Sequence, residues 1–431
     1  MDANDKTSEI ALPTGVKDFL PAKAAKIDHL SRTLYGTFRR WGFQRIVPPS
    51  LEYLSVLERG IGATLRDRVL RFDDRLSGRM VAFSPDITAQ VARIAATRMR
   101  EHPLPLRLCY SGRVLRHTEQ QAGKDREIFQ DGVELIGLDS PEADAEMIAM
   151  VVESLTALGA GEFTVDIGQV EFFRGVMASL PLTDDLARRV EAAIAHKDSS
   201  GLKALLADID IDEQARAEVL ALPRLFGGPE VIEKAAAVVR NDRSRRALEN
   251  LEKVFEILKV YGVEKHVTID LGELRGLDYH TGIIFQGFLP GLGRAVCSGG
   301  RYDNLTARYG FPAPATGFTF NLLNLLFALD RELDQQVSTG SDVLILQGGT
   351  DKEPAQRAAQ ALRRRGYSAA RDIIRRELEQ TVEYARKTHF TYLMIIGDEG
   401  KDARLVRLDD RSERQIAFAD LLADDFTLDP T

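Results

Sequence analysis

The residues of this chain best suited to chemistry lie in two polar, glycine-containing blocks between positions 274 and 305. Each block stands beside an apolar, β-branched run, and 289–293, Leu-Pro-Gly-Leu-Gly, reads as a hairpin turn between them. Two adjacent strands would then share a pocket whose arginine, carboxylate and aromatic hydroxyls suit a zwitterion. The first block holds Arg275, Asp278, Tyr279 and His280, and the second holds Gly299, Gly300, Arg301, Tyr302 and Asp303.

An ordinary hairpin with structurally satisfied polar residues would show the same spacing. Gly299 and Gly300 permit close backbone approach in either case. Spacing alone therefore leaves a ligand pocket and a purely structural hairpin both open.

The two blocks also resemble a known family. Arg275-Gly-Leu-Asp-Tyr and Gly299-Gly-Arg-Tyr-Asp-Asn are similar to the two histidine-recognition motifs of histidyl-tRNA synthetases, in the same order. The resemblance covers nearly the whole chain. It implies an α+β fold of the class II aminoacyl-tRNA synthetase type, in which an antiparallel sheet with flanking helices carries a helical insertion and a small C-terminal α/β domain follows.

The resemblance implies a histidine-binding site. Two of its positions depart from the synthetase pattern, because Asp86 stands where a glutamate is usual and His280 where a second tyrosine is usual. His280 changes both the length and the titration behaviour of the pocket wall. The implied histidine-binding residues are Asp86, Thr88, Arg116, Gln130, Glu134, Arg275, Tyr279, His280 and Tyr302.

Residues 106–115 and 127–136 are expected to be two strands joined by a loop, similar to motif 2 of class II synthetases. By this resemblance Arg116 would hold the amino-acid carboxylate. On the adenine side the pattern differs, with Thr118 in place of a glutamate and Lys124 in place of an arginine.

Ser84-Pro-Asp86 leads into an expected helix. By resemblance Asp86 would contact the ligand's amino group. In the structural alternative, Ser84 caps the helix, Pro85 takes its first position and Asp86 favours the positive helix end.

The segment 315–326 resembles motif 3, but the residues that stabilise charge on ATP are missing. Leu323 stands at the glutamate position and Asn324 at the arginine position. Asparagine cannot replace a bidentate cation at phosphate. We therefore expect no catalytic residues, no cofactor and no metal site.

The remaining elements follow from periodicity and turn residues. A helix over 22–40 and a strand over 43–47, closed by Pro48-Pro49, resemble the motif 1 dimer interface. Residues 69–73 and 79–83 should form a hairpin, and 142–158 a helix. Domains are expected at 1–335, with a helical insertion at about 170–262, and at 341–431, where strand–helix alternation indicates a small, mainly parallel layer similar to the anticodon-binding domain.

Bulk properties exclude several function classes. The 431 residues carry a net charge of −8, and only two cysteines and seven histidines occur, with no zinc spacing and no disulfide framework. No apolar run reaches membrane-spanning length. We expect a cytoplasmic protein and no nucleic-acid partner, although acidic proteins can bind RNA through local patches.

These features favour a catalytically silent relative of the synthetases, the regulatory subunit of ATP phosphoribosyltransferase. That resemblance implies a short-form catalytic subunit as partner, L-histidine as feedback effector, and a homodimer within a hetero-oligomer. The alternatives are a divergent histidyl-tRNA synthetase, favoured by the C-terminal domain, and a stand-alone histidine sensor or tRNA-binding protein.

Overall fold

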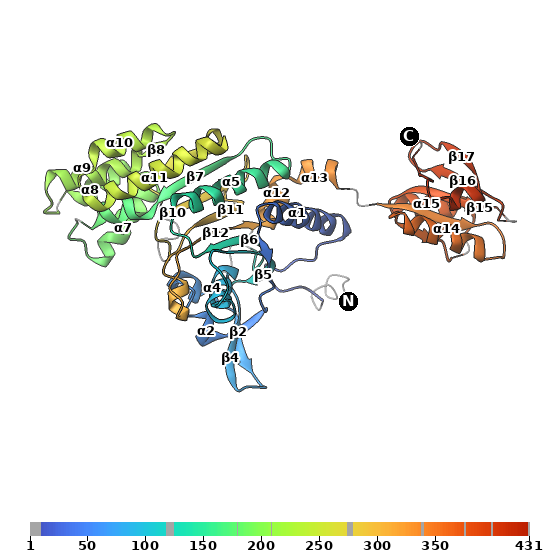
Figure 1. Cartoon of the computed structure of the whole chain (residues 1–431), viewed down its shortest axis with the longest axis horizontal. Helices are drawn as coiled ribbons and strands as arrows, with labels where there is room; N and C mark the ends of the chain where they lie inside the picture. The colour runs from blue at the N-terminus through green and yellow to red at the C-terminus, as the bar shows by residue number, and fades with distance from the viewer. Residues whose placement is uncertain are drawn as a thin grey trace, which may run out of the picture. The chain divides into compact units, whose positions relative to one another are not determined.

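The chain folds into two compact units, Met1–Gln336 and Val337–Thr431 (Figure 1). The computed structural model describes residues 10–117, 125–178, 180–207, 209–273, 279–337, 340–374, 376–397 and 400–429. The first unit carries the candidate ligand-binding residues, and the second is a separate sheet domain.

A nine-stranded sheet forms the centre of the first unit. Its strands follow the order β1-β5-β6-β12-β11-β10-β7-β9-β8. Every neighbouring pair is antiparallel except β1–β5 and β7–β9, so the predicted antiparallel sheet is confirmed. The bounds are β1 Gln44–Arg45, β5 Leu106–Leu115, β6 Glu127–Ile136, β7 Thr164–Gln169, β8 Phe226–Gly227, β9 Val267–Asp270, β10 Ile283–Phe288, β11 Cys297–Arg301 and β12 Ala315–Asn321.

Both hairpins expected around the site are present. β5 and β6 pair from Leu106↔Ile136 to Leu115↔Glu127. β10 and β11 pair through Ile284↔Gly300. Residues 274–278, which include Arg275 and Asp278, lie outside the described residues.

Helices α1 (Pro21–Arg40) and α5 (Pro141–Ala157) cover one face of the sheet, together with α12 (Leu322–Ala328). The predicted apolar stripe of α1 is buried at Leu30, Leu34 and Phe38, because residues three and four apart share one helix face. A short helix, α13 (Asp330–Gln336), closes this unit.

The segment 51–98 packs against β5 and β6 through its last helix. It forms a three-stranded sheet, β2-β4-β3, followed by α4 (Ile87–Arg98), which contacts β5 and β6. The predicted hairpin is confirmed by the pairing of β3 with β4 from Arg71↔Ala82 to Asp74↔Arg79. The other bounds are β2 Leu51–Tyr53, α2 Leu54–Leu57, α3 Ala63–Arg66, β3 Arg71–Asp74 and β4 Arg79–Phe83.

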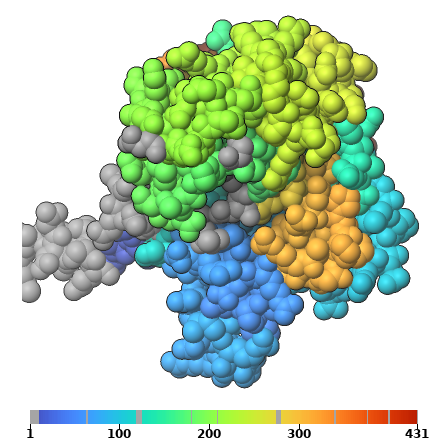
Figure 2. Space-filling view, turned by 90° about the vertical axis from the view of Figure 1, so that its left-hand side faces the viewer, coloured from blue at the N-terminus to red at the C-terminus, as the bar shows by residue number. Residues whose placement is uncertain are grey.

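Six helices fill the segment 170–261, and Figure 2 shows them in green and yellow beside the blue residues of segment 51–98. Side chains cap several of them, as when Thr183 accepts from the Leu186 amide and Asn241 from the Ser244 amide. The segment is not wholly helical, because β8 pairs with β9 and extends the central sheet. The helices are α6 Val170–Met177, α7 Asp184–Ala195, α8 Ser199–Leu206, α9 Glu213–Ala221, α10 Glu230–Val238 and α11 Asp242–Tyr261.

The second unit is a five-stranded sheet in the order β14-β13-β15-β16-β17. The expectation of a mainly parallel layer is wrong, because β15–β16 and β16–β17 are antiparallel and only β13–β14 and β13–β15 are parallel. Five residues separate β15 from β16 and five separate β16 from β17, which is too few for the crossover connection that a parallel pair requires. The bounds are β13 Ser341–Gln347, α14 Glu353–Arg364, β14 Ala369–Arg371, α15 Leu378–Lys387, β15 Phe390–Ile396, β16 Asp402–Arg407, β17 Glu413–Ala417 and α16 Phe418–Leu422.

In the part of the chain that the structure describes, no helix is both long and apolar enough to cross a membrane.

Candidate functional site

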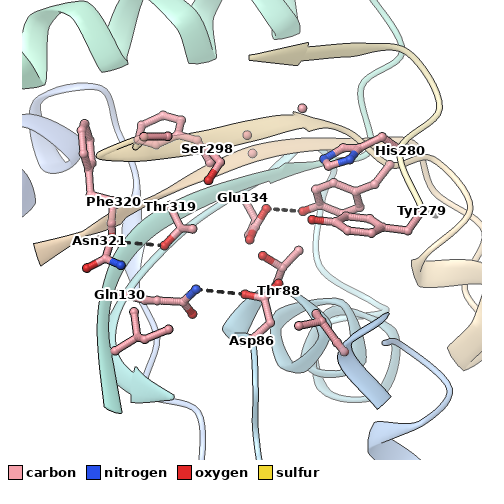
Figure 3. A pocket seen from close by; sticks show the side chains of 18 of the residues that line it. Asp86, Thr88, Gln130, Glu134, Tyr279, His280, Ser298, Thr319, Phe320 and Asn321 are labelled. Atoms are coloured by element: carbon pink, nitrogen blue, oxygen red, sulfur yellow. Dashed lines mark hydrogen bonds between the residues drawn. The ribbon is translucent and has the colours of Figure 1, made fainter. Parts of the chain in front are cut away.

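A pocket of about 320 Å³ opens on the face of the central sheet that α4 flanks. Eight of the nine predicted histidine-binding residues line it, and the ninth, Arg275, lies outside the described residues. The lining side chains surround one space although they come from distant segments (Figure 3). The eight are Asp86, Thr88, Arg116, Gln130, Glu134, Tyr279, His280 and Tyr302.

Strand register brings these residues together. β12 pairs with β6 so that Gly317 lies opposite Glu134 and Asn321 opposite Gln130. A side chain at position 317 would place its Cβ 1.9 Å from Glu134 Oε2. Glycine at this position therefore makes room for the carboxylate.

Glu134 is the buried carboxyl group of the pocket. It is only 1% exposed, and its Oε2 accepts the hydroxyl of Tyr302 while its Oε1 accepts that of Tyr110 at 3.3 Å. Burial raises the pKa of Glu134 to about 8, although the neighbouring hydroxyls oppose this effect and Asp86 adds to it. A cationic ligand would favour the ionised form.

This pKa predicts a pH-dependent stability. The unfolded chain loses the Glu134 proton near the ordinary value of 4.5, whereas the folded chain keeps it until about pH 8. The unfolded state binds fewer protons across that window, so the free energy of unfolding should fall as pH rises from about 4.5 to 8. Urea unfolding followed by fluorescence of Trp41, the single tryptophan, should show this fall for the wild type and a smaller one for Glu134→Gln. If the free energy of unfolding fell equally with pH in the wild type and in Glu134→Gln, this prediction would be contradicted.

Asp86 and Gln130 join α4 to the sheet. Gln130 donates from Nε2 to Asp86 Oδ1 at 3.2 Å and accepts the Ile87 amide on Oε1 at 3.2 Å. Two parts of the structural alternative are wrong, because Asp86 rather than Ser84 occupies the N-cap and α4 begins at Ile87 rather than at Pro85. Asp86 does lie at the N-terminal end of the helix, although its side chain makes no capping bond. Ser84 instead donates to the Asp86 carbonyl at 2.6 Å. The Asp86 carboxylate thus lines the pocket beside the helix start.

Tyr279 and His280 form an aromatic wall. Their rings stack with centroids 4.2 Å apart, and His280 is 8% exposed. Burial raises the pKa of the Tyr279 hydroxyl far above its ordinary value. Gly300 has φ +157°, and a Cβ there would come 2.7 Å from the His280 ring. The second glycine of the motif therefore accommodates this histidine.

Arg116 lines the pocket and donates a hydrogen bond from its Nε to the Pro85 carbonyl at 2.7 Å. The guanidinium is thus oriented for an anionic group. The loop residues Thr118, Glu119 and Lys124 lie outside the described residues.

The far end of the pocket carries amides where nucleotide chemistry would need cations. Asn321 caps α12 by accepting the amides of Leu323 (3.0 Å) and Asn324 (3.2 Å). Asn324 donates from Nδ2 to the Ala295 carbonyl at 2.7 Å. Both side chains therefore make hydrogen bonds to the backbone of the chain.

Sequence reasoning missed some of the residues that line the pocket. Ser298 and Thr319 also line the pocket, and strand alternation in β11 and β12 was the available signal. Arg301 is absent from the lining. It pairs with the buried Asp144 at 2.9 Å and with Asp303 at 3.0 Å, so it ties β11 to α5.

Among the described residues, no group of three or more His, Cys, Asp or Glu side chains could hold a metal ion.

Comparison with known proteins gives consistent results. A family model described as histidyl-tRNA synthetase matches residues 15–325. The chain is 63% identical over 420 residues to the ATP phosphoribosyltransferase regulatory subunit of Syntrophotalea carbinolica, covering 97% of this chain and 98% of the relative. It is 52% identical over 424 residues to the protein of the same name from Geobacter sulfurreducens, covering 98% and 97%.

Solved structures share the fold. A crystal structure described as an ATP phosphoribosyltransferase regulatory subunit/histidyl-tRNA synthetase from Bacillus halodurans C has a TM-score of 0.76 at 26% identity, covering 90% of this chain and 98% of that one. Histidyl-tRNA synthetase from Nostoc sp. PCC 7120 has a TM-score of 0.80 at 22% identity, covering 96% and 98%. At that identity the second likeness concerns the fold alone.

Proposed function

The chain belongs to the family of ATP phosphoribosyltransferase regulatory subunits, and from that premise we propose that it binds L-histidine in the Glu134 pocket and passes this signal to a catalytic partner. The regulatory role follows from the family. The effector, the residues that hold it and the assembly are our proposal.

The observation that carries the proposal is the buried Glu134 carboxylate beside an aromatic wall. Histidine offers a cationic ammonium, a carboxylate and a planar ring. Asp86 and Glu134 suit the cationic groups, Arg116 suits the carboxylate, and the stacked Tyr279–His280 pair suits the ring. By resemblance, Arg275 would supply a second contact to the carboxylate.

The direct test is calorimetric titration with L-histidine, using L-leucine as control. Histidine should bind with one site per chain, and leucine, which lacks the ring nitrogens, should not. Equal heats for the two amino acids would count against a histidine pocket.

The proposed partner is a short-form catalytic subunit of ATP phosphoribosyltransferase. Capture of the tagged chain from its native host should recover that subunit and no tRNA. In the second unit, Arg363 donates to the Ala369 carbonyl (2.8 Å) and Arg365 to the Leu421 carbonyl (3.1 Å). These contacts commit two of the three clustered arginines to the fold, which favours a structural role over an RNA surface. Recovery of tRNA alone would favour the synthetase alternative.

We expect no histidyl-adenylate formation. Asn324 stands at the arginine position of motif 3 and is bonded to the Ala295 carbonyl, so the charge on departing pyrophosphate would lack a cation there. ATP–pyrophosphate exchange with histidine and Mg²⁺ should remain at the level without enzyme. Histidine-dependent exchange would contradict this prediction.

A homodimer through α1 and the strand after it completes the proposal. Apolar side chains remain exposed along this part of the unit, with Val47 78%, Leu51 42% and Tyr35 38% exposed. A two-fold assembly would cover them. Light scattering should give twice the chain mass at micromolar concentration, and Val47→Asp should lower it toward the monomer. A monomeric wild type would rule out this assembly.

A further inference from the structure

A second cavity, of about 510 Å³, lies between α1 and the sheet face opposite the Glu134 pocket. Residues alternate across β6, so Gln130 and Glu134 face the pocket while Asp131 faces α1. We propose that this cavity binds a primary ammonium on an apolar carbon skeleton through the carboxylate of Asp131.

Asp131 is the reason to expect a ligand. It is 2% exposed, and neither carboxylate oxygen has a hydrogen-bond partner among the described residues. The hydroxyls of Ser31 and Ser111 lie nearby, bond each other at 3.3 Å and oppose the rise in the pKa of Asp131. Both are neutral, so they leave the carboxylate without a counter-charge. An unpaired buried carboxylate is costly, so a bound cation would stabilise the protein.

No described cation of the chain reaches Asp131 within ion-pair distance. The two basic residues lining the cavity are engaged elsewhere, Lys17 with Asp125 at 2.6 Å and Arg113 with Glu127 at 3.1 Å. Burial raises the pKa of Asp131, and the hydroxyls and the more distant Arg45 only partly offset this.

The rest of the lining indicates the ligand's body. Phe19, Ile27, Phe129 and Leu322 supply apolar walls, and the rings of Phe19 and Phe129 meet edge to face at 5.5 Å. An ammonium can be held by one carboxylate, flanking hydroxyls and aromatic faces. Asp18 and Asp28 also line the cavity, but no three acidic, histidine or cysteine side chains of the described residues are grouped so that they could hold a metal ion.

The probe is n-butylammonium chloride, with 1-butanol as its uncharged isostere, and binding is measured by ligand-observed NMR titration of the full chain. Butylammonium should bind the wild type, and its affinity for Asp131→Asn should be at least about tenfold lower, because a charge-assisted contact is lost. Butanol should not distinguish the two proteins. Asp131→Asn should also unfold at higher urea concentration than the unliganded wild type.

Two further variants separate the site from general effects. Ala24 on α1 lines the cavity and is exposed to solvent. Ala24→Leu should therefore fill part of the cavity without altering Asp131, and should weaken butylammonium binding. Asp185→Asn makes the same chemical change as Asp131→Asn, but at an exposed residue of α7, and it should leave butylammonium binding unchanged. Equal butylammonium affinity for wild type and Asp131→Asn would overturn the site.

The cation can come from a free amine or from a basic side chain of a second copy. Sedimentation equilibrium distinguishes these sources. If Asp131→Asn weakens self-association at least about tenfold and butylammonium competes with it, a second copy supplies the cation and the site stands. If butylammonium does not bind and self-association does not change, the proposal fails.

Discussion

Replacing Arg301 with methionine is expected to lower the free energy of unfolding of the first unit by about 3–5 kcal/mol. Arg301 Nε contacts Asp144 Oδ2 at 2.9 Å, and the two side chains are 7% and 1% exposed. The guanidinium also donates to Asp303 (3.0 Å) and to the carbonyls of Leu138 and Ser140 (3.2 Å each). Methionine would remove the guanidinium donor from the buried Asp144 carboxylate and from the Leu138 carbonyl, whereas the Ser140 carbonyl would still accept the Ala143 amide at 3.1 Å.

The pair must be ionised for this cost to arise. Burial raises the pKa of Asp144, while Arg301 opposes that rise, and the contacts to Asp144 and Asp303 raise the pKa of Arg301 against the effect of its own burial. We take the pair as charged because its 2.9 Å contact is that of a charge-assisted hydrogen bond.

Trp41 makes the measurement specific, because the only tryptophan of the chain lies in the first unit. Urea unfolding followed by its fluorescence should give a clearly lower midpoint for Arg301→Met. Arg308→Met, the same change at an exposed arginine, should stay near the wild-type midpoint. Adding Asp144→Leu to Arg301→Met should recover part of the loss, since no buried charge is then left alone. Additive losses in the double variant would contradict the ion-pair explanation.

The sequence predicted elements whose signals are local. The strands 106–115 and 127–136 match β5 and β6 residue for residue, because turn-forming and polar residues separate two strand-forming runs. The stripe of α1 followed from its period. β17 and α16 were missed, because the short segment 413–422 shows neither a clear alternation nor a helical repeat.

The site was less predictable where it depends on sheet order. The sequence separates Glu134 from Tyr302 by 168 positions, and only the order β6-β12-β11 brings their side chains together. For the pocket, the resemblance to the synthetases indicated which of these distant residues lie together. It did not show that Arg301, inside a recognition motif, faces α5, or that Asp131 is left unpaired behind the pocket, because both depend on tertiary contacts of this chain.

Glu134→Gln is expected to weaken histidine binding by about 10- to 150-fold, because hydrogen bonds to a charged group contribute about 1.5–3 kcal/mol. The amide keeps the size of the side chain and removes its charge, so the effect isolates the attraction to the ligand's cationic groups. Glu127→Gln is the matched control, since Glu127 lies on the same strand, outside the pocket, and pairs with the exposed Arg113. Calorimetry should give Glu127→Gln an affinity within about twofold of the wild type.

The same variants should separate histidine binding from feedback in the complex with the catalytic subunit. If histidine inhibits through this pocket, it must bind the active and inactive assemblies with different affinities. Transferase rate is measured against histidine concentration, each curve being normalised to the rate of the same assembly without histidine. The half-inhibitory concentration should rise with Glu134→Gln by about the factor seen in calorimetry and stay unchanged with Glu127→Gln. If Glu134→Gln weakens binding but leaves the inhibition curve in place, histidine inhibits the transferase at another site, and histidine binding in the Glu134 pocket does not carry the feedback.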